Sequence, residues 1–368
     1  MSRTKPVRIT NILYALLVLS CIAVILLVAG AVAWHDIQEA DRHFQNFGND
    51  YARQLRQKLT RSEMVVDGIA ALGQTGGLKK RRQLSRYARE MSKQQPYIHM
   101  IQLYERVEQG QRRNFEKKKR AAGLTDFMIH SLDDDLNRKP AEHEPFHFPL
   151  VMVQPDGPFF TRYFGYDIYS DPLARQAIMR AIDTGQSAAS KPGRLMGGGY
   201  GSTLLKPIYS SRVVTGTRQE RIAKAVGIAA VQLRFDKQLF PRSSLPGLAA
   251  LLSYRGSSDS DTVSTRELFR QEIPADSAAV GWFPRFSFTT DLNFGGEKLH
   301  LSLSRPASWK DLRLGLIASI VGILALFGWL FLRLIKRPLD WYGSEQYQHE
   351  ILFQEKERAE VTLASIGD

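Results

Sequence analysis

The stretch NILYALLVLSCIAVILLVAGAVA, residues 11–33, contains no charged side chain. At a rise of about 1.5 Å per residue, a helix of this length spans the roughly 30 Å of hydrocarbon in a bilayer. The alternative is a cleaved signal peptide, but the apolar run is longer than the core of such a peptide usually is. The stretch therefore predicts a transmembrane helix over residues 11–34 and places the chain among membrane proteins.

A second uncharged run, LGLIASIVGILALFGWLFL at residues 314–332, predicts another transmembrane helix over residues 312–335. Basic residues flank the outer ends of the pair, namely Arg3, Lys5 and Arg8 before the first run and Arg333, Lys336 and Arg337 after the second. Because an excess of Lys and Arg marks the cytoplasmic side, we expect residues 1–10 and 336–368 in the cytoplasm. The predicted location is the bacterial inner membrane, with two spans and about 280 periplasmic residues between them.

The composition between the spans is that of a folded domain. The chain has 368 residues, 43% of them hydrophobic, and 50 Lys and Arg against 37 Asp and Glu give a net charge of +13. These values exclude a disordered chain. The only cysteine, Cys21, lies in the first apolar run, so the exported part depends on its core rather than on an intramolecular disulfide.

The positive charge is concentrated in residues 79–120, which contain 14 Lys or Arg and 4 Asp or Glu. Nucleic acid is not an expected partner for a segment outside the membrane. Such a run is usually a solvated helix face, and the alternative is a surface that binds polyanions. This alternative leaves open a second function, a membrane-anchored binding or adhesion protein with a basic periplasmic surface.

Residue periodicity predicts a helical stalk over residues 35–95. Apolar residues such as Phe44, Tyr51 and Leu55 recur there at intervals of three or four among polar residues, as on one face of a helix. Gly73, Gly76 and Gly77 interrupt the pattern and predict a turn into a second helix. The stalk is therefore expected to contain two helices.

The rest of the exported segment is rich in strand-like runs, at residues 97–107, 145–153, 159–166, 203–209, 223–235, 247–254 and 280–305. One helix lies among them, because Ser170-Asp171-Pro172 supplies an N-cap and a proline at the first helical position. A polar segment over residues 211–221 predicts a boundary between two sheet modules, residues 96–211 and 212–310. The predicted fold class is α/β in the mixed α+β sense.

Catalytic and metal-binding motifs are not evident. His143 and His147 have a spacing found in metal sites, but Pro145 disfavours the helix that would place them on one face. The glycine run at residues 197–201 lacks the Gly-Lys-Ser/Thr of a phosphate loop and is better explained as a hairpin tip. No Gly-x-Ser-x-Gly elbow or Ser-x-x-Lys set is present. We therefore expect a binder without catalytic residues, metal or cofactor.

An ordered series of residues carries a resemblance to a known family: Leu103, Arg106, Val107, Arg113, Phe115, Glu116, Gly123, Phe127, Ile129, Phe148, Pro149, Gly165, Tyr166, Asp167, Ser170, Pro172, Arg175, Ala181, Asp183, Thr184, Gly185, Pro192, Leu195, Pro207, Ile208 and Tyr209. In this series the chain resembles the CHASE family, extracytoplasmic sensor domains of histidine kinases, cyclases and cyclic-di-GMP enzymes. The resemblance implies a long helix leaving the membrane, followed by two PAS-like modules, over about 270 residues.

The resemblance also implies that a small molecule binds in the membrane-distal module. The candidate ligand-binding residues are Tyr166, Asp167, Arg175, Ser190, Met196, Leu205 and Tyr209. Plant cytokinin receptors of this family hold an adenine-like ligand with an Asp and a Thr at positions that are Ala174 and Leu205 here. Because a site without its polar anchors loses discrimination, a more apolar or aromatic ligand is expected.

Residues 355–368 resemble the lead-in to a cytoplasmic PAS domain, which in related receptors is often followed by GGDEF and EAL modules. We therefore expect the chain to be the input part of a receptor that controls a cyclic-di-GMP enzyme or a histidine kinase beyond residue 368. Ala318 and Gly322 form a small-xxx-small pair in the second span. The pair is consistent with a homodimer.

Overall fold

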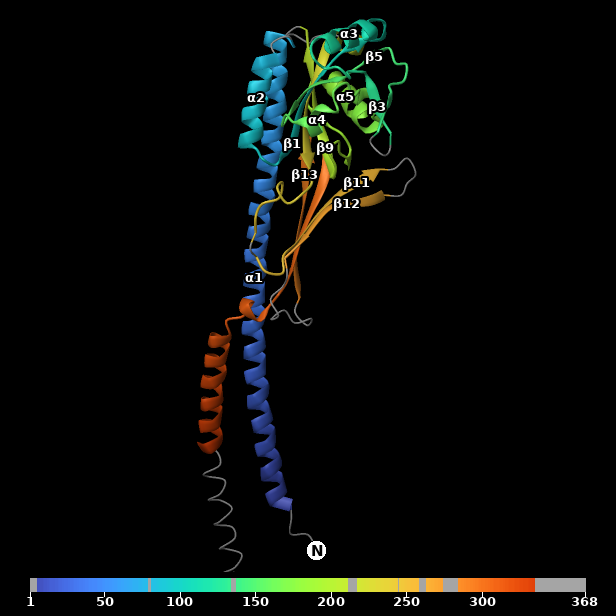
Figure 1. The fold of residues 1–368 in the computed structure, drawn as a ribbon. Helices are drawn as coiled ribbons and strands as arrows, with labels where there is room; N and C mark the ends of the chain where they lie inside the picture. Colours follow the sequence, from blue (N-terminus) through green and yellow to red (C-terminus); the bar gives the residue numbers. More distant parts are fainter. Residues whose placement is uncertain are drawn as a thin grey trace, which may run out of the picture. The chain divides into compact units, whose positions relative to one another are not determined.

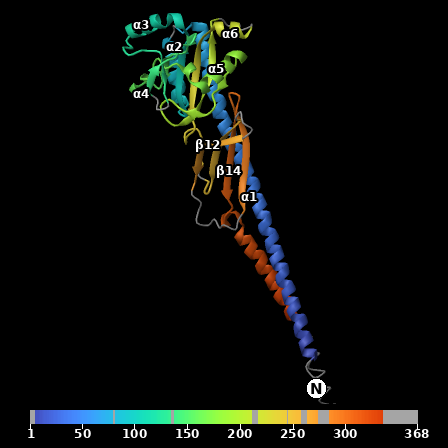
Figure 2. The same ribbon diagram turned by 90° about the vertical axis from the view of Figure 1, so that its right-hand side faces the viewer.

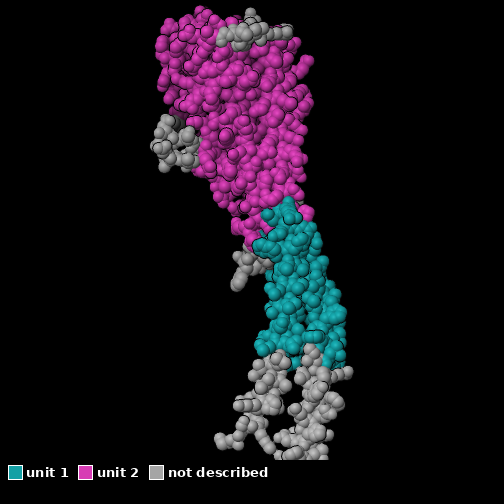
Figure 3. Space-filling model, turned by 180° about the vertical axis from the view of Figure 1, so that it is seen from behind, with its two compact units in different colours: residues 1–42, 278–281, 307–368 teal, residues 43–277, 282–306 magenta. Residues whose placement is uncertain are grey.

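In a computed structural model, the described residues are 5–78, 81–133, 137–210, 217–243, 245–257, 263–273 and 284–334. They form two compact units, coloured in Figure 3. The first unit contains the described residues up to Arg42 and from Ala307 onward, and the second contains those from His43 to Pro306. The predicted cytoplasmic linker, residues 336–368, lies outside the described residues.

The first unit contains two helices that are long and apolar enough to cross a membrane, the first part of α1 (Lys5–Gly76) and Leu314–Leu334. The short helix η3 (Trp309–Asp311) precedes the second of them. The carboxylate of Asp36 accepts the backbone N–H of Arg313 at 3.0 Å, and the Arg313 guanidinium donates to Glu39 at 2.6 Å. These polar contacts join the two helices where the apolar sequence ends.

The second unit contains a large antiparallel sheet of six strands in the order β6-β1-β10-β9-β7, with β8 paired to β9. Its strands are β1 (Ile98–Glu105), β6 (Leu150–Gln154), β7 (Ala188–Ala189), β8 (Gly193–Arg194), β9 (Tyr200–Tyr209) and β10 (Ala225–Arg234). Ala229 of β10 pairs with both Leu103 and Lys206. This pairing corrects the module boundary predicted at residue 211, because β10 joins β1 to β9 within the large sheet.

Helices cover both faces of the large sheet (Figures 1 and 2). On one face lie the end of α1, where Gly73 contacts Ile208, and α2 (Arg81–Gln94). On the other face lies α5 (Pro172–Thr184), and the Tyr209 hydroxyl donates to the carbonyl of Ile182 at 3.1 Å. The helix α1 ends at Gly76, as the glycines predicted, and Gly77 follows with a φ of 69°.

Short elements connect the strands of the large sheet. They are β2 (Val107–Glu108), η1 (Gln109–Gln111), α3 (Arg112–Ala121), β3 (His130–Leu132), β4 (Arg138–Pro140), β5 (Phe146–His147), α4 (Pro158–Thr161), η2 (Ile168–Ser170) and α6 (Arg218–Lys224). The strand predicted at residues 159–166 is wrong. Pro158 opens the helical turn α4 and Phe159 packs edge-on against Phe160 at 5.0 Å, so the aromatic run is helical and then turns.

A small antiparallel sheet has the order β12-β11-β14-β13. Its strands are β11 (Ala249–Ser257), β12 (Val263–Glu272), β13 (Arg285–Phe294) and β14 (Glu297–Pro306). Alternate residues of β13, including Phe286 and Phe288, are buried, as expected for a strand with one covered face. The helix α1 covers that face, because Phe44 packs against Phe286 at 6.0 Å and Gly48 lies against the ring of Phe288.

The turn between β13 and β14 reaches the large sheet. The backbone N–H of Ala189 donates to the carbonyl of Gly295 at 2.8 Å. The Arg180 guanidinium donates to the Glu297 carboxylate and to the Ala189 carbonyl, each at 2.6 Å. Tyr254 donates its hydroxyl to the same carboxylate at 2.8 Å. We call Arg180, Ala189, Gly295 and Glu297 the tip contact, which joins the two sheets of the second unit.

Candidate ligand-binding site

A cavity of about 260 Å³ lies between the large sheet, the start of α5 and the hairpin of β8 and β9. This volume is just below the roughly 300–1,000 Å³ of drug-sized ligand pockets, so it suits a small metabolite. Its lining residues come from strands β1, β3, β8, β9 and β10, from η2 and α5, and from the loops next to them: Gln102, Tyr104, Leu132, Asp133, Tyr166, Ile168, Ser170, Asp171, Pro172, Leu173, Ala174, Ser190, Lys191, Gly193, Arg194, Leu195, Met196, Gly201, Thr203 and Gln232.

Local sequence signals shape two walls of the cavity. The Asp171 carboxylate accepts the backbone N–H of Leu173 at 2.9 Å, and Pro172 occupies the first turn, so α5 begins at the cavity. The opposite wall is a hairpin, as the glycine run predicted. Its tip turns through Gly197, Gly198 and Gly199, all with φ between 83° and 92°, a region that favours glycine.

The floor of the cavity presents three buried polar atoms that have no hydrogen-bond partner among the described residues. They are Oε1 of Gln102, the hydroxyl of Tyr104 and Oε1 of Gln232, on residues that are 0%, 0% and 4% exposed. A buried polar atom without a partner costs about 1–3 kcal/mol, so most such atoms in proteins are paired. All three residues line the same cavity.

In the structure, the nitrogen of each of the two amides faces a protein atom. Nε2 of Gln232 donates to Oγ1 of Thr203 at 3.5 Å, and Nε2 of Gln102 lies 3.5 Å from the sulfur of Met100. Each amide nitrogen therefore has one protein contact, and each carbonyl oxygen has none among the described residues. The floor is consequently rich in hydrogen-bond acceptors.

One acid and two phenols add to the polarity of the cavity. Burial raises the pKa of the Asp171 carboxyl above its usual range, against the opposing effect of the backbone N–H groups of Leu173 and Ala174. Burial raises the pKa of both Tyr104 and Tyr166 well above the ordinary value, and the charge of Asp171 raises both further. Both phenols are therefore neutral at physiological pH and lie within the field of one carboxylate.

Three of the residues predicted to bind ligand line this cavity, namely Tyr166, Ser190 and Met196. Oγ of Ser190 accepts the backbone N–H of Thr203 at 3.0 Å, which fixes the loop to β9. Leu205 and Tyr209 instead lie in the apolar core between α5 and the sheet. Their side chains fill space beside the cavity without lining it.

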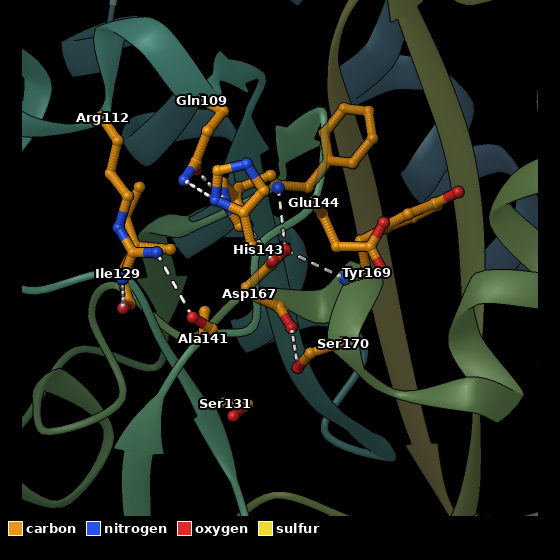
Figure 4. A network of polar contacts seen from close by, with 12 residues as sticks. Gln109, Arg112, Ile129, Ser131, Ala141, His143, Glu144, Asp167, Tyr169 and Ser170 are labelled. Atoms are coloured by element: carbon orange, nitrogen blue, oxygen red, sulfur yellow. Dashed lines mark hydrogen bonds and ion pairs between the residues drawn. The ribbon is translucent and has the colours of Figure 1, made fainter.

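Asp167 belongs to a polar network next to the cavity (Figure 4), and Arg175 contacts Glu144 and Tyr169 of this network. The Asp167 carboxylate accepts the backbone N–H groups of Phe148 and Tyr169 at 2.8 and 3.1 Å and contacts Nδ1 of His147 at 2.7 Å. The Arg175 guanidinium lies over the Tyr169 ring, 4.4 Å from its centroid, and donates to Glu144 at 2.9 Å. Both side chains thus hold the loops that support the cavity.

The two histidines with metal-like spacing are joined through an amide. Nε2 of His147 lies 2.8 Å from Oε1 of Gln109. Nε2 of Gln109 in turn lies 2.8 Å from Nδ1 of His143 (Figure 4). Within the part of the chain that the structure describes, no group of three or more His, Cys, Asp or Glu residues is placed to hold a metal ion. The geometry around these histidines is that of a hydrogen-bond chain.

Sequence reasoning missed the floor residues Gln102, Tyr104 and Gln232 and the wall residue Asp171. A signal for the two glutamines was present, because each interrupts an apolar run, MIQLY at residues 100–104 and AAVQL at residues 229–233. A polar residue inside a fully buried strand needs a partner. That requirement identifies such positions as candidates for a site.

The family model of the CHASE domain matches residues 79–263, which include the large sheet and every residue of the cavity. The chain therefore belongs to the CHASE-domain family. CHASE domains are sensor domains, without catalytic activity of their own, that membrane receptors carry outside the membrane. The family thus assigns the second unit to extracellular sensing, and the two candidate spans agree with a membrane protein that has an external domain.

No curated protein matches the chain. Two solved structures are similar to it, the extracellular domains of the histidine kinases mmHK1S-Z2 and mmHK1S-Z3. The first is 12% identical with a TM-score of 0.35, covering 75% of this chain and 98% of that one. The second is 11% identical with a TM-score of 0.35, covering 76% and 97%. At scores this low, neither likeness carries an argument about this chain.

Proposed function

We propose that this chain is the sensing and membrane-spanning part of a receptor in the bacterial inner membrane, and that a small molecule binds in the cavity of the large sheet. The observation that carries the proposal is the set of unpartnered polar atoms on Gln102, Tyr104 and Gln232. A core selected only for stability would pair these atoms or replace them by apolar groups. A cavity lined by them is suited to recognition.

The path for a signal within the second unit starts at the loop that follows β7. Ser190 lines the cavity, and the preceding residue, Ala189, is bonded to Gly295 and Arg180 in the tip contact. A ligand that moves the loop over residues 190–196 therefore acts on the hairpin of β13 and β14. Strand β14 ends at Pro306, after which the chain continues to the helix Leu314–Leu334.

In this proposal the two sheets correspond to the two PAS-like modules, and two chains associate through the second helix with Ala318 and Gly322 at their contact. The output is a cyclic-di-GMP enzyme or a histidine kinase. The support is the resemblance of the sequence to receptors of that kind and the small side chains of the helix, which permit close approach. Single cysteines along Leu314–Leu334 should crosslink between chains with helical periodicity, and uniform crosslinking would contradict the homodimer.

The alternative of a basic surface for polyanions receives less support. Several of the basic side chains in residues 79–120 have partners inside the protein. Lys119 is 9% exposed and contacts Glu105 at 3.0 Å, and Arg112 donates to Glu116 at 3.1 Å and to the carbonyl of Ile129 at 2.7 Å. Part of the positive charge is thus neutralised and structural.

The test of the sensing function uses the full chain in lipid nanodiscs and a metabolite library, with thermal unfolding as the readout. A ligand at 100 times its dissociation constant adds about 2.7 kcal/mol to the free energy of unfolding, which shifts the transition clearly. We expect a compound that stabilises the parent chain and changes the crosslinking of Leu314–Leu334. If the chain is folded and no compound in the library has these effects, the proposal is contradicted.

A further inference from the structure

We infer that the cavity selects a ligand with a compact primary amine attached to an apolar body. This inference rests on the sensing function proposed above and names the chemistry of its ligand. It starts from the three unpartnered polar atoms of the floor, which belong to residues at least nine-tenths buried.

The floor groups differ in what they are able to bind. The two glutamine oxygens accept hydrogen bonds and donate none, and the Tyr104 hydroxyl does both. The Asp171 carboxylate, when ionised, is also an acceptor only. A ligand carboxylate or phosphate would bring further acceptors against these oxygens. A primary ammonium group has three N–H donors and no acceptor, so its chemistry is the complement of this floor.

The remaining walls describe the other end of the ligand. Leu132, Ile168, Leu195 and Met196 contribute apolar surface, and Ala174 adds a small apolar side chain. The phenol rings of Tyr104 and Tyr166 add aromatic surface, and a cation placed over such a ring is stabilised by roughly 0.5–2 kcal/mol. An apolar or aromatic group carrying one amine therefore fits both parts of the lining.

Three further charged residues line the cavity. Arg194 is exposed, so solvent screens its charge, and the formal charges of Arg194 and the half-buried Lys191 are balanced by those of Asp133 and Asp171. Asp133 accepts the backbone N–H of Asn137 at 2.7 Å as part of a turn. The buried groups of the floor therefore decide which charge the cavity prefers.

The experiment compares three probes of similar size and shape: 2-phenylethylamine, 2-phenylethanol and 3-phenylpropionate. Calorimetry and thermal unfolding are measured on the full chain in nanodiscs. We expect the amine to bind at least about tenfold more tightly than the alcohol and the carboxylate to show no binding. Gln232→Leu and Gln102→Leu should each weaken binding of the amine by about tenfold, whereas Tyr209→Phe, outside the cavity, should leave it unchanged.

The outcomes separate the ligand class from the sensing function. If the carboxylate or the alcohol binds most tightly and Gln232→Leu weakens that binding, the preference for an amine is wrong. The cavity then remains the proposed site of the sensor. If none of the three probes binds a folded chain, the preference for an amine is also wrong. The sensing function is tested separately by the metabolite library. Binding of the amine without any change in the crosslinking of Leu314–Leu334 would keep the ligand class and count against signalling.

Discussion

The backbone N–H of Ala189 donates to the carbonyl oxygen of Gly295 over 2.8 Å. These residues belong to different sheets, and Ala189 directly precedes Ser190 of the cavity lining. This bond therefore joins the residue next to the cavity lining to the turn between β13 and β14 of the small sheet. It makes the tip contact the first place to test coupling.

Replacement of Gly295 should loosen the tip contact. An added Cβ there would lie 2.5 Å from the Ala189 nitrogen and 2.6 Å from Cδ1 of Leu204, whereas at Gly296 no atom lies within 4 Å. Both glycines have positive φ, 52° and 85°, so both Ala variants carry backbone strain. We expect Gly295→Ala to lower the unfolding free energy by about 1–3 kcal/mol more than Gly296→Ala. If denaturant titrations show the same loss of unfolding free energy in both variants, the tip contact is not tightly packed around Gly295.

Gln232→Leu should stabilise the ligand-free chain. The substitution removes a buried carbonyl oxygen without a partner, loses only the long 3.5 Å contact of Nε2 with Thr203 and keeps a similar volume, so the unfolding free energy should rise by about 1 kcal/mol. Tyr209→Phe is the contrasting variant, because it removes the hydrogen bond to the Ile182 carbonyl and should cost about 1 kcal/mol. Thermal unfolding measures both. A loss of stability in Gln232→Leu would mean that its oxygen is already satisfied.

Asp167→Asn should be strongly destabilising. The carboxylate accepts two backbone N–H groups and contacts His147, and both side chains are at most 1% exposed. An amide in this place lacks the charge of a fully buried carboxylate that accepts two backbone N–H groups, so we expect a cost of about 2–4 kcal/mol. Asp156→Asn is the matched control at an exposed ion pair with Arg89 and should cost less than about 0.5 kcal/mol. Chemical denaturation measures the unfolding free energy of both variants. If both lose less than about 0.5 kcal/mol, the buried contacts of Asp167 do not stabilise the fold.

Alkaline pH should weaken the fold through Tyr254. Burial first, then its hydrogen bond to Glu297 and the charge of that carboxylate, raise the pKa of Tyr254 to about 12. The unfolded chain loses this proton near pH 10 and the folded chain retains it, so the stabilising contribution is complete below about pH 10 and is lost as the pH rises toward 12. Absorbance titration of the parent chain against Tyr254→Phe isolates the group. In Glu297→Gln the pKa of Tyr254 should fall, and an unchanged titration would show that Glu297 is not its partner.

The two candidate spans offer a test with the native cysteine. A Cβ built at Gly328 lies 3.9 Å from Cβ of Cys21, within the range that a disulfide requires. Mild oxidation of Gly328→Cys in membranes should therefore close a disulfide within one chain, seen on non-reducing gels after proteolysis between the spans. Gly315→Cys is the control, because no atom lies within 4 Å of its Cβ position and the residue is not part of the proposed contact between chains. Equal oxidation of both variants would contradict the packing of the two helices.

Local patterns predicted the elements whose signals are local. The cap at Asp171, the end of α1 at its glycines and the hairpin tip at residues 197–201 are confirmed, because each depends on a few neighbouring residues. The partner of β10 was not predictable in this way. A buried strand has the same apolar pattern whichever sheet it joins, and the choice depends on residues far along the chain.

The candidate site was predicted in part for a related reason. Thr203 and Leu205 lie on the same face of β9, two residues apart, yet Thr203 lines the cavity and Leu205 is covered by the core beside α5. Strand alternation gives the face of a side chain and says nothing about what covers it. The loop residue Ser190 was found through the family resemblance, whereas Gln102 and Gln232 required knowledge of which strands are neighbours.

The helix α1 has a consequence for how the second unit melts. Its residue Asp67 contacts Lys206 of the large sheet at 3.1 Å, and Arg56 donates to Thr290 of the small sheet at 2.9 Å. Each sheet thus depends on the same helix to cover one of its faces, and loss of either would leave that helix partly unsupported. The two sheets should therefore unfold in a single cooperative transition. A molecule bound to the large sheet would then slow hydrogen exchange in β13 and β14, although it touches neither strand.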